Sequence, residues 1–118
     1  MEILNTESFK NKIYDFTQSA NWQFKGSKPT IIDFYADWCG PCHQMNPVLE
    51  EVSLNYSNEI DIYKIDTDAT PELAALFEIT SLPSIVFIPL NNDLAISHGF
   101  MPFESFKNAI EELFLITK

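Results

Sequence analysis

The chain has 118 residues, 46% of them hydrophobic and 14% aromatic, which is enough for one domain with a single core and too short for two. Seven lysines, no arginine and seventeen acidic residues give a formal net charge of −10. This balance argues against nucleic acid or an anionic membrane surface as a partner, because phosphate binding relies on clustered lysine and arginine. No apolar run approaches the ~20 residues of a membrane helix. The N-terminal stretch lacks the continuous apolar segment of a secretory signal, so we expect a cytoplasmic protein.

The first expected elements are a helix and a buried strand. Residues 6–19 have apolar positions at helical spacing and begin with Thr6, a candidate N-cap. Residues 22–29 are polar and turn-like. The run 30–36 is apolar and rich in β-branched and aromatic residues, which predicts a strand buried on both faces. The apolar positions of the helix are Phe9, Ile13 and Phe16.

A second helix is expected from Cys42 to Asn58, with Pro47 inside the pattern, so a kink is expected in its first turns. The two cysteines of the chain, Cys39 and Cys42, therefore lie where a central strand is followed by a helix. The apolar stripe of this helix consists of Met45, Leu49, Val52 and Tyr56.

The next segment predicts a strand at 60–66 and a short helix that ends near Phe77. Thr70 is the candidate N-cap of this helix, and Pro71 occupies its first position, where a missing N–H costs no hydrogen bond.

The last third of the chain predicts a strand at 84–88, a turn at 91–93, a returning strand at 94–97 and a C-terminal helix at 103–117 after Pro102. Helices that alternate with strands favour parallel pairing, and the hairpin adds an antiparallel edge. We therefore expect an α/β fold with a mixed central sheet and helices on both faces. Residues 1–118 would form a single domain.

The cysteine pair has four possible explanations: a redox couple, half of a zinc site, a structural disulfide, or chance. A disulfide that closes a four-residue loop stabilises by only about 2 kcal/mol, against about 3 kcal/mol for fifteen residues. A zinc site would need His43 and His98, and His43 follows Cys42 directly, unlike the usual spacing of paired ligands. In a reducing cytoplasm a lone CxxC motif is typical of redox chemistry, which we favour.

The position of the pair at a helix start gives each cysteine a distinct expected role. Cys39 would face unpaired amide groups and the positive end of the helix dipole, which stabilise a thiolate. Cys42, one turn further on, would resolve the mixed disulfide that Cys39 forms. Gly40 allows a partner backbone to come close, and Pro41 fixes φ at a position where its N–H would be unpaired.

The run Asp33-Phe-Tyr-Ala-Asp-Trp-Cys-Gly-Pro-Cys42, with Pro47, Leu82-Pro83 and Gly99, resembles the thioredoxin family over nearly the full chain. The resemblance implies the thioredoxin fold and a disulfide reductase that is recharged by a flavin- and NADPH-dependent thioredoxin reductase. It implies no cofactor held by this chain. We expect a monomer that acts on disulfide-containing proteins.

Asp33 interrupts an apolar strand, and burial raises the pKa of a carboxyl group that lacks a partner. The alternative is an acid at a solvated strand end, which the apolar residues on both sides disfavour. The resemblance implies that Asp33 accepts the proton of Cys42, a role that suits a carboxyl group with a raised pKa.

The resemblance also implies a cis Leu82–Pro83 bond beside the cysteines, although only ~5% of such bonds are cis in general. The residues around Cys39 would form an apolar surface suited to varied protein partners. Phe100 belongs either to this surface or to the core. The expected surface consists of Trp38, Gly40, Pro41, Leu82, Pro83, Gly99 and Phe100.

Two positions, His43 and Ile62, depart from the family pattern. His43 replaces a common lysine, and histidine changes charge near neutral pH, so we hypothesise a more pH-dependent redox potential; a surface histidine without consequence is the alternative. Some family members place a lysine beside the buried acid, but Ile62 aligns there, which puts such an ion pair in doubt. Lys64 lies on the same strand face two residues on. His98 is interpreted as a polar edge residue.

Two other functions stay open. A thioredoxin-fold chain can act as a binding module through its apolar surface, independently of its thiols. A disulfide oxidase or isomerase would need an oxidising compartment, and hence an export signal that the N-terminal stretch does not provide, unless the chain is the processed form of a longer precursor.

Overall fold

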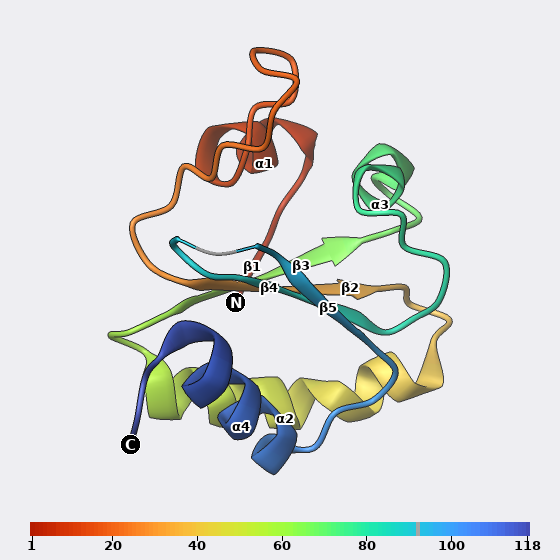
Figure 1. The fold of residues 1–118 in the computed structure, drawn as a ribbon. Coiled ribbons are helices and arrows are strands. Elements are labelled where there is room, and N and C mark those ends of the chain that lie inside the picture. The colour runs from red at the N-terminus through yellow and green to blue at the C-terminus, as the bar shows by residue number, and fades with distance from the viewer. Residues whose placement is uncertain (92) are drawn as a thin grey trace.

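The computed structural model describes residues 1–91 and 93–118 (Figure 1). Five strands and four helices are assigned in this part of the chain. In chain order they are β1 (Glu2–Ile3), α1 (Thr6–Lys12), β2 (Thr30–Tyr35), α2 (Gly40–Tyr56), β3 (Asp61–Asp66), α3 (Pro71–Leu76), β4 (Ser84–Ile88), β5 (Ala95–His98) and α4 (Phe103–Phe114).

The strands form one mixed sheet in the order β1-β3-β2-β4-β5. β1, β3 and β2 are parallel, whereas β4 is antiparallel to both β2 and β5. The expected mixed sheet is confirmed, but antiparallel pairing begins at β2–β4 and not only in the hairpin. β1 has two residues, too few for a periodic pattern, and it was not predicted.

Helices cover both faces of the sheet: α1 and α3 lie on one side, and α2 and α4 lie on the other (Figure 1). β2 is central and buried on both faces, as its apolar composition predicts. Successive side chains of β2 alternate between the two layers, so Ile31 packs toward α2 and α4, whereas Ile32 and Phe34 pack toward α1 and α3. By the same alternation, Asp33 shares the face of Ile31, beneath α2.

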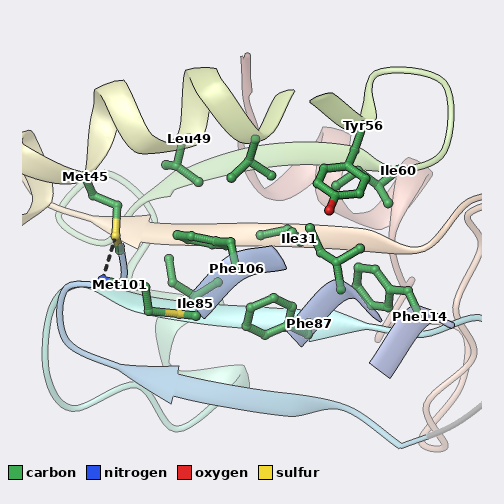
Figure 2. Close-up of a cluster of buried hydrophobic side chains, with 12 residues drawn as sticks. Ile31, Met45, Leu49, Tyr56, Ile60, Ile85, Phe87, Met101, Phe106 and Phe114 are labelled. Atoms are coloured by element: carbon green, nitrogen blue, oxygen red, sulfur yellow. Dashed lines mark hydrogen bonds between the residues drawn. The ribbon is translucent and has the colours of Figure 1, made fainter. Parts of the chain in front are cut away.

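The core under α2 and α4 explains how α2 is held against the sheet (Figure 2). The predicted stripe of α2 is buried along its whole length and meets side chains from β2, β4 and α4. The backbone N–H of Met101 donates to Sδ of Met45, 3.2 Å away, which ties the segment before α4 to α2. The cluster comprises Ile31, Met45, Leu49, Val52, Tyr56, Ile60, Ile85, Phe87, Met101, Phe106, Ile110 and Phe114.

The first helix is shorter than its pattern predicts. Its N-cap is Asn5 rather than Thr6, and the side chains of Asn5 and Ser8 form a reciprocal capping box. The helix ends at Lys12, not near residue 19. Asp15 accepts hydrogen bonds from both the N–H and the hydroxyl of Thr17, a local turn that competes with helical hydrogen bonding.

The other boundaries need smaller corrections. α2 begins at Gly40, two residues before Cys42, and continues through Pro47. Thr70 is the N-cap of α3 and Pro71 its first residue, as predicted, although the Thr70 hydroxyl donates to the carbonyl of Asp66.

The C-terminal part of the chain also departs from its pattern. α4 ends at Phe114 rather than residue 117, and Leu115 has a left-handed φ of 59°. β5 lies one residue later than expected. The predicted turn at 91–93 includes Asn92, which lies outside the described residues. Within 1–91 and 93–118, no helix combines the length and apolar character that membrane crossing requires.

Candidate active site

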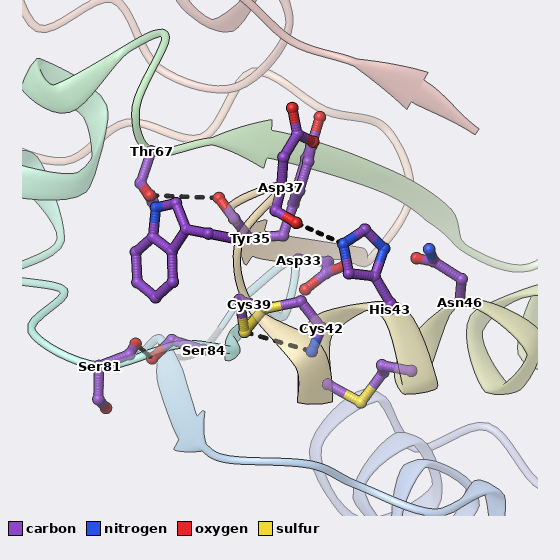
Figure 3. The surroundings of a disulfide bond; sticks show 12 residues. Asp33, Tyr35, Asp37, Cys39, Cys42, His43, Asn46, Thr67, Ser81 and Ser84 are labelled. Atoms are coloured by element: carbon purple, nitrogen blue, oxygen red, sulfur yellow. Dashed lines mark hydrogen bonds between the residues drawn. A yellow bond between two sulfur atoms is a disulfide. The ribbon is translucent and has the colours of Figure 1, made fainter.

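Cys39 is the N-cap residue of α2, and its sulfur forms a disulfide with Cys42 (Figure 3). The backbone N–H of Cys42 donates to Sγ of Cys39 over 3.3 Å. An N-cap side chain normally satisfies one of the unpaired amides of a helix start with an oxygen; here a sulfur does so. The same amide and the helix dipole would stabilise a negative charge on that sulfur after reduction.

The disulfide packs into a small cluster with Ala36, Tyr35 and Leu82. Cys39 is 4% exposed and Cys42 2%, so the expected difference in burial between them is small in the oxidised form. Gly40 and Pro41 are exposed above the pair.

Asp33 is fully buried in the middle of β2, as the sequence predicts. Neither of its carboxylate oxygens has a hydrogen-bond partner among the described residues. Burial raises the pKa of Asp33 from 3.8 to about 6, and the nearby Lys64 ammonium opposes this rise. A carboxyl group with this pKa can exchange a proton near neutral pH.

Lys64 supplies the ion pair that the sequence left in doubt. It faces Asp33 in the parallel β2–β3 register, and its Nζ lies 3.5 Å from Oδ2 of Asp33. The same ammonium donates to Oδ1 of Asn46 and lies 4.6 Å from the ring centre of Tyr35. Ile62, two residues earlier on β3, packs against the core under α2 and α4.

The segments that carry Leu82–Pro83 and Gly99 are linked beside the disulfide. The Leu82–Pro83 peptide bond is cis, as expected, and the N–H of Gly99 donates to the carbonyl of Pro83 over 2.8 Å. Gly99 has φ +91°, a conformation that side-chain-bearing residues rarely adopt. Leu82 is half-buried against the cysteines, whereas Pro83 is buried.

Two aromatic side chains near these segments are exposed: Trp38 at 72% and Phe100 at 46%. The core interpretation of Phe100 is therefore wrong. Nε1 of Trp38 donates to Oδ2 of Asp68 over 2.9 Å, which fixes the indole beside the active-site turn. Sequence reasoning missed Asp68, because only the fold brings it next to a tryptophan thirty positions earlier.

Both histidines are exposed and take part in local hydrogen bonds. The ring of His43 donates from Nε2 to the carbonyl of Asp37 over 2.6 Å (Figure 3). His98, on edge strand β5, has its Nδ1 2.9 Å from Oγ of Ser84, and that hydroxyl also lies 2.7 Å from the carbonyl of Ser81. The interpretation of His98 as a polar edge residue is confirmed. Among the described residues, no group of three or more His, Cys, Asp or Glu side chains is arranged to hold a metal ion.

A pocket of about 300 Å³ opens beside Cys42, on the side of Lys64. Its wall includes polar and charged groups from α2, from β3 and from the turn before α2. The lining residues include Tyr35, Asp37, Cys42, His43, Asn46 and Lys64. Asn46 was not singled out in the sequence, because its partner Lys64 comes from a different element.

Comparison with known proteins agrees with this geometry. The thioredoxin family model matches residues 1–112. The chain is 41% identical to a thioredoxin of Borreliella burgdorferi over 111 residues, which is 94% of this chain and 95% of that protein. It is 35% identical to a thioredoxin of Staphylococcus aureus over 82 residues, covering 70% and 79% of the two chains.

A solved structure extends the agreement to three dimensions. The crystal structure of chloroplastic thioredoxin z matches with a TM-score of 0.80 and 27% identity, over 96% of this chain and 93% of that one. A cysteine pair at a helix start, the sheet topology and the family match point to the same conclusion. The chain belongs to the thioredoxin family and is a thiol–disulfide oxidoreductase.

Proposed function

We propose that this chain is a protein-disulfide reductase that cycles between a Cys39/Cys42 dithiol and disulfide. The observation that carries the proposal is the position of Cys39 Sγ at the N-cap of α2, where it accepts the N–H of Cys42. Residues 1–118 act as one domain and, we infer, as a monomer in a reducing compartment, the cytoplasm. The chain itself holds no cofactor in this proposal.

The reaction is two successive thiol–disulfide exchanges. The Cys39 thiolate attacks one sulfur of a substrate disulfide, forms a mixed disulfide and releases the other substrate sulfur as a thiolate, which takes a proton from solvent. Cys42 then loses its proton, and its thiolate attacks Sγ of Cys39 and releases the second substrate thiolate. Two electrons pass to the substrate, and the Cys39–Cys42 disulfide is left.

Asp33 is the proposed proton acceptor for Cys42. Its buried carboxylate lies on the sheet face beneath α2. Lys64 forms an ion pair with Asp33 and also lines the pocket that Cys42 lines. Its pKa of about 6 makes the carboxylate the main form at neutral pH while keeping it basic enough to take a proton.

Substrate proteins dock on the exposed surface around Cys39. Trp38 and Phe100 supply aromatic contact area. A partner backbone can come close at Gly40, Pro41 and Gly99, because their side chains are small or absent. This surface is mostly apolar, which suits partners of varied sequence. A thioredoxin reductase of the flavin- and NADPH-dependent type returns the two electrons.

Reduction of insulin with dithiothreitol tests this proposal. Wild-type protein is expected to accelerate the reaction, and Cys39→Ser is expected to abolish the acceleration. If wild-type protein reduces insulin no faster than Cys39→Ser does, a binding module is favoured instead. The equilibrium potential separates a reductase from an oxidase or isomerase: about −270 mV is general for thioredoxin and about −180 mV for disulfide isomerase, values taken from those proteins and not from this structure.

A further inference from the structure

The ammonium group of Lys64 contacts two side chains, Asn46 and Asp33, at unequal distances. Its hydrogen bond to Oδ1 of Asn46 is 2.5 Å long, whereas Oδ2 of Asp33 lies 3.5 Å away. The Lys64 side chain is 13% exposed and that of Asp33 is fully buried. Because little water screens these two charges, electrostatic interactions between them are stronger than at the surface. The ammonium nevertheless makes its close contact with the neutral amide.

The fold places Asn46 where it can compete for this ammonium. Asn46 lies four residues after Cys42 on α2, one helical turn along (Figure 3). It lines the same pocket as Cys42 and Lys64. Both Asp33 oxygens remain without a hydrogen bond among the described residues, even though a cation lies within ion-pair distance.

We propose that Asn46 is a positioning residue that holds the Lys64 ammonium outside hydrogen-bond contact with Asp33, so that the carboxylate keeps its capacity to accept the Cys42 proton. This inference rests on the proposed function, in which Asp33 is that acceptor. A charge-assisted hydrogen bond from lysine would stabilise the ionised carboxylate and make it a weaker base. Asn46 thus limits how strongly Lys64 acts on Asp33.

Several other groups face Lys64 and the pocket, and the proposal takes them into account. From β2 come Asp33 and the Tyr35 ring, from the turn before α2 comes Asp37, from α2 come His43 and Glu50, and from the N-terminal segment comes Met1. Among the described residues, only Asp33 forms an ion pair with Lys64. Asn46 is the side chain that accepts a hydrogen bond from it.

The direct test follows the Asp33 carboxyl carbon by NMR during a pH titration of the reduced protein. In Asn46→Ala the ammonium loses its amide partner and can close on Asp33, so the titration midpoint is expected to fall by about one pH unit. In Asn46→Asp a second carboxylate draws the ammonium away and adds like charge, so the midpoint is expected to rise. Opposite shifts from two substitutions at one position would not result from a loss of stability alone.

Asn55→Ala is the matched control. Asn55 is also on α2, is exposed, and donates to the carbonyl of Glu51 on its own helix, so its loss should leave the midpoint unchanged. An Asp33 midpoint that stays in place or rises in Asn46→Ala would overturn the proposal. A rise would mean that Asn46 brings Lys64 toward Asp33.

Insulin reduction in the same variants separates this inference from the proposed function. If Asp33→Asn slows the reaction at neutral pH while Asn46→Ala has no effect on the midpoint, only the inference fails. If Asp33→Asn leaves the rate unchanged, Asp33 is not the acceptor, whatever Asn46 does to its titration. Where both hold, Asn46→Ala should slow insulin reduction roughly three-fold, because a weaker base transfers the proton more slowly.

Discussion

The backbone N–H of Cys42 points at the sulfur of Cys39, 3.3 Å away, at the first turn of α2. The amide of the second cysteine thus stabilises the first, and the three-residue spacing is what brings them together. Gly40 and Pro41 fill the two positions between them without contributing a bulky side chain over the sulfur. The CxxC spacing therefore serves both the disulfide and the ionisation of the attacking thiol.

This hydrogen bond predicts that the two thiols of the reduced protein differ in the pH at which they ionise and in their rate of alkylation. A free peptide thiol ionises at about pH 8.5, and Cys39 should ionise at a lower pH. Cys39 should also react with iodoacetamide at pH 7 roughly ten-fold faster than Cys42. Alkylation rates across pH, measured by mass spectrometry on Cys39→Ser and Cys42→Ser, assign each rate to one sulfur. Equal rates, or a peptide-like Cys39, would contradict the proposed roles.

A second prediction concerns stability and pH. The pKa of Asp33 rises from 3.8 to about 6 on folding, so the folded protein holds this proton more tightly than the unfolded chain. Stability therefore falls as pH rises from about 4 to about 6, by about 3 kcal/mol in total. Asp33→Asn has no carboxyl group at this position and does not lose this stability. The difference in free energy of unfolding, Asp33→Asn minus wild type, should therefore become about 3 kcal/mol more positive from about pH 4 to about pH 6.

Guanidinium unfolding of the oxidised proteins at about pH 3.5 and about pH 7.5 measures that change. The comparison between two pH values removes any constant cost of placing an amide in the strand. Glu72→Gln, which neutralises an exposed acid in the first turn of α3, is the control and should show a much smaller change. A difference between Asp33→Asn and wild type that does not vary with pH would refute the assignment.

Much of this architecture follows from the sequence, because the strands β2 and β4 and the stripe of α2 are set by apolar periodicity. Boundaries follow less well where side chains compete with the backbone. Asn5 displaced Thr6 as the N-cap because Ser8 completes its capping box, and Asp15 formed a turn where the helical pattern still continued.

The cysteines and Asp33 could be predicted because a short motif and a polar residue in an apolar strand are local signals. The Lys64–Asn46 contact could not, since it depends on the β2–β3 register and on the rotation of α2 over the sheet. The same holds for the Trp38–Asp68 hydrogen bond. The family resemblance instead pointed to Ile62, which is partly buried and packs against the core under α2 and α4.

His43 gives a third prediction. Its ring donates to the carbonyl of Asp37 at the start of α2, which holds the imidazole close to the redox pair (Figure 3). We expect the redox potential of wild type to depend more steeply on pH than that of His43→Lys, whose charge is constant through neutrality. Electrochemical titration of both proteins from about pH 5.5 to about pH 8.5 tests this, and parallel curves would exclude a role for His43.

The exposed ring of Phe100 gives the last prediction. It follows Gly99, whose N–H is bonded to Pro83, so it extends the docking surface beyond the cysteines. Loss of an aromatic contact residue costs about 1–2 kcal/mol of binding, so Phe100→Ser should raise KM for insulin roughly 5- to 30-fold. The rate with a small aromatic disulfide, which needs no extended surface, should change little.

Leu54→Ser is the matched control for the Phe100 variant. Leu54 is 82% exposed near the C-terminal end of α2, far along the helix from Cys42, so its loss removes a similar apolar contact outside the docking surface. Its KM for insulin should match wild type. If both substitutions raise KM equally, general surface hydrophobicity governs binding; if neither does, Phe100 lies outside the footprint of the partner, and docking would then depend on Trp38 and Leu82.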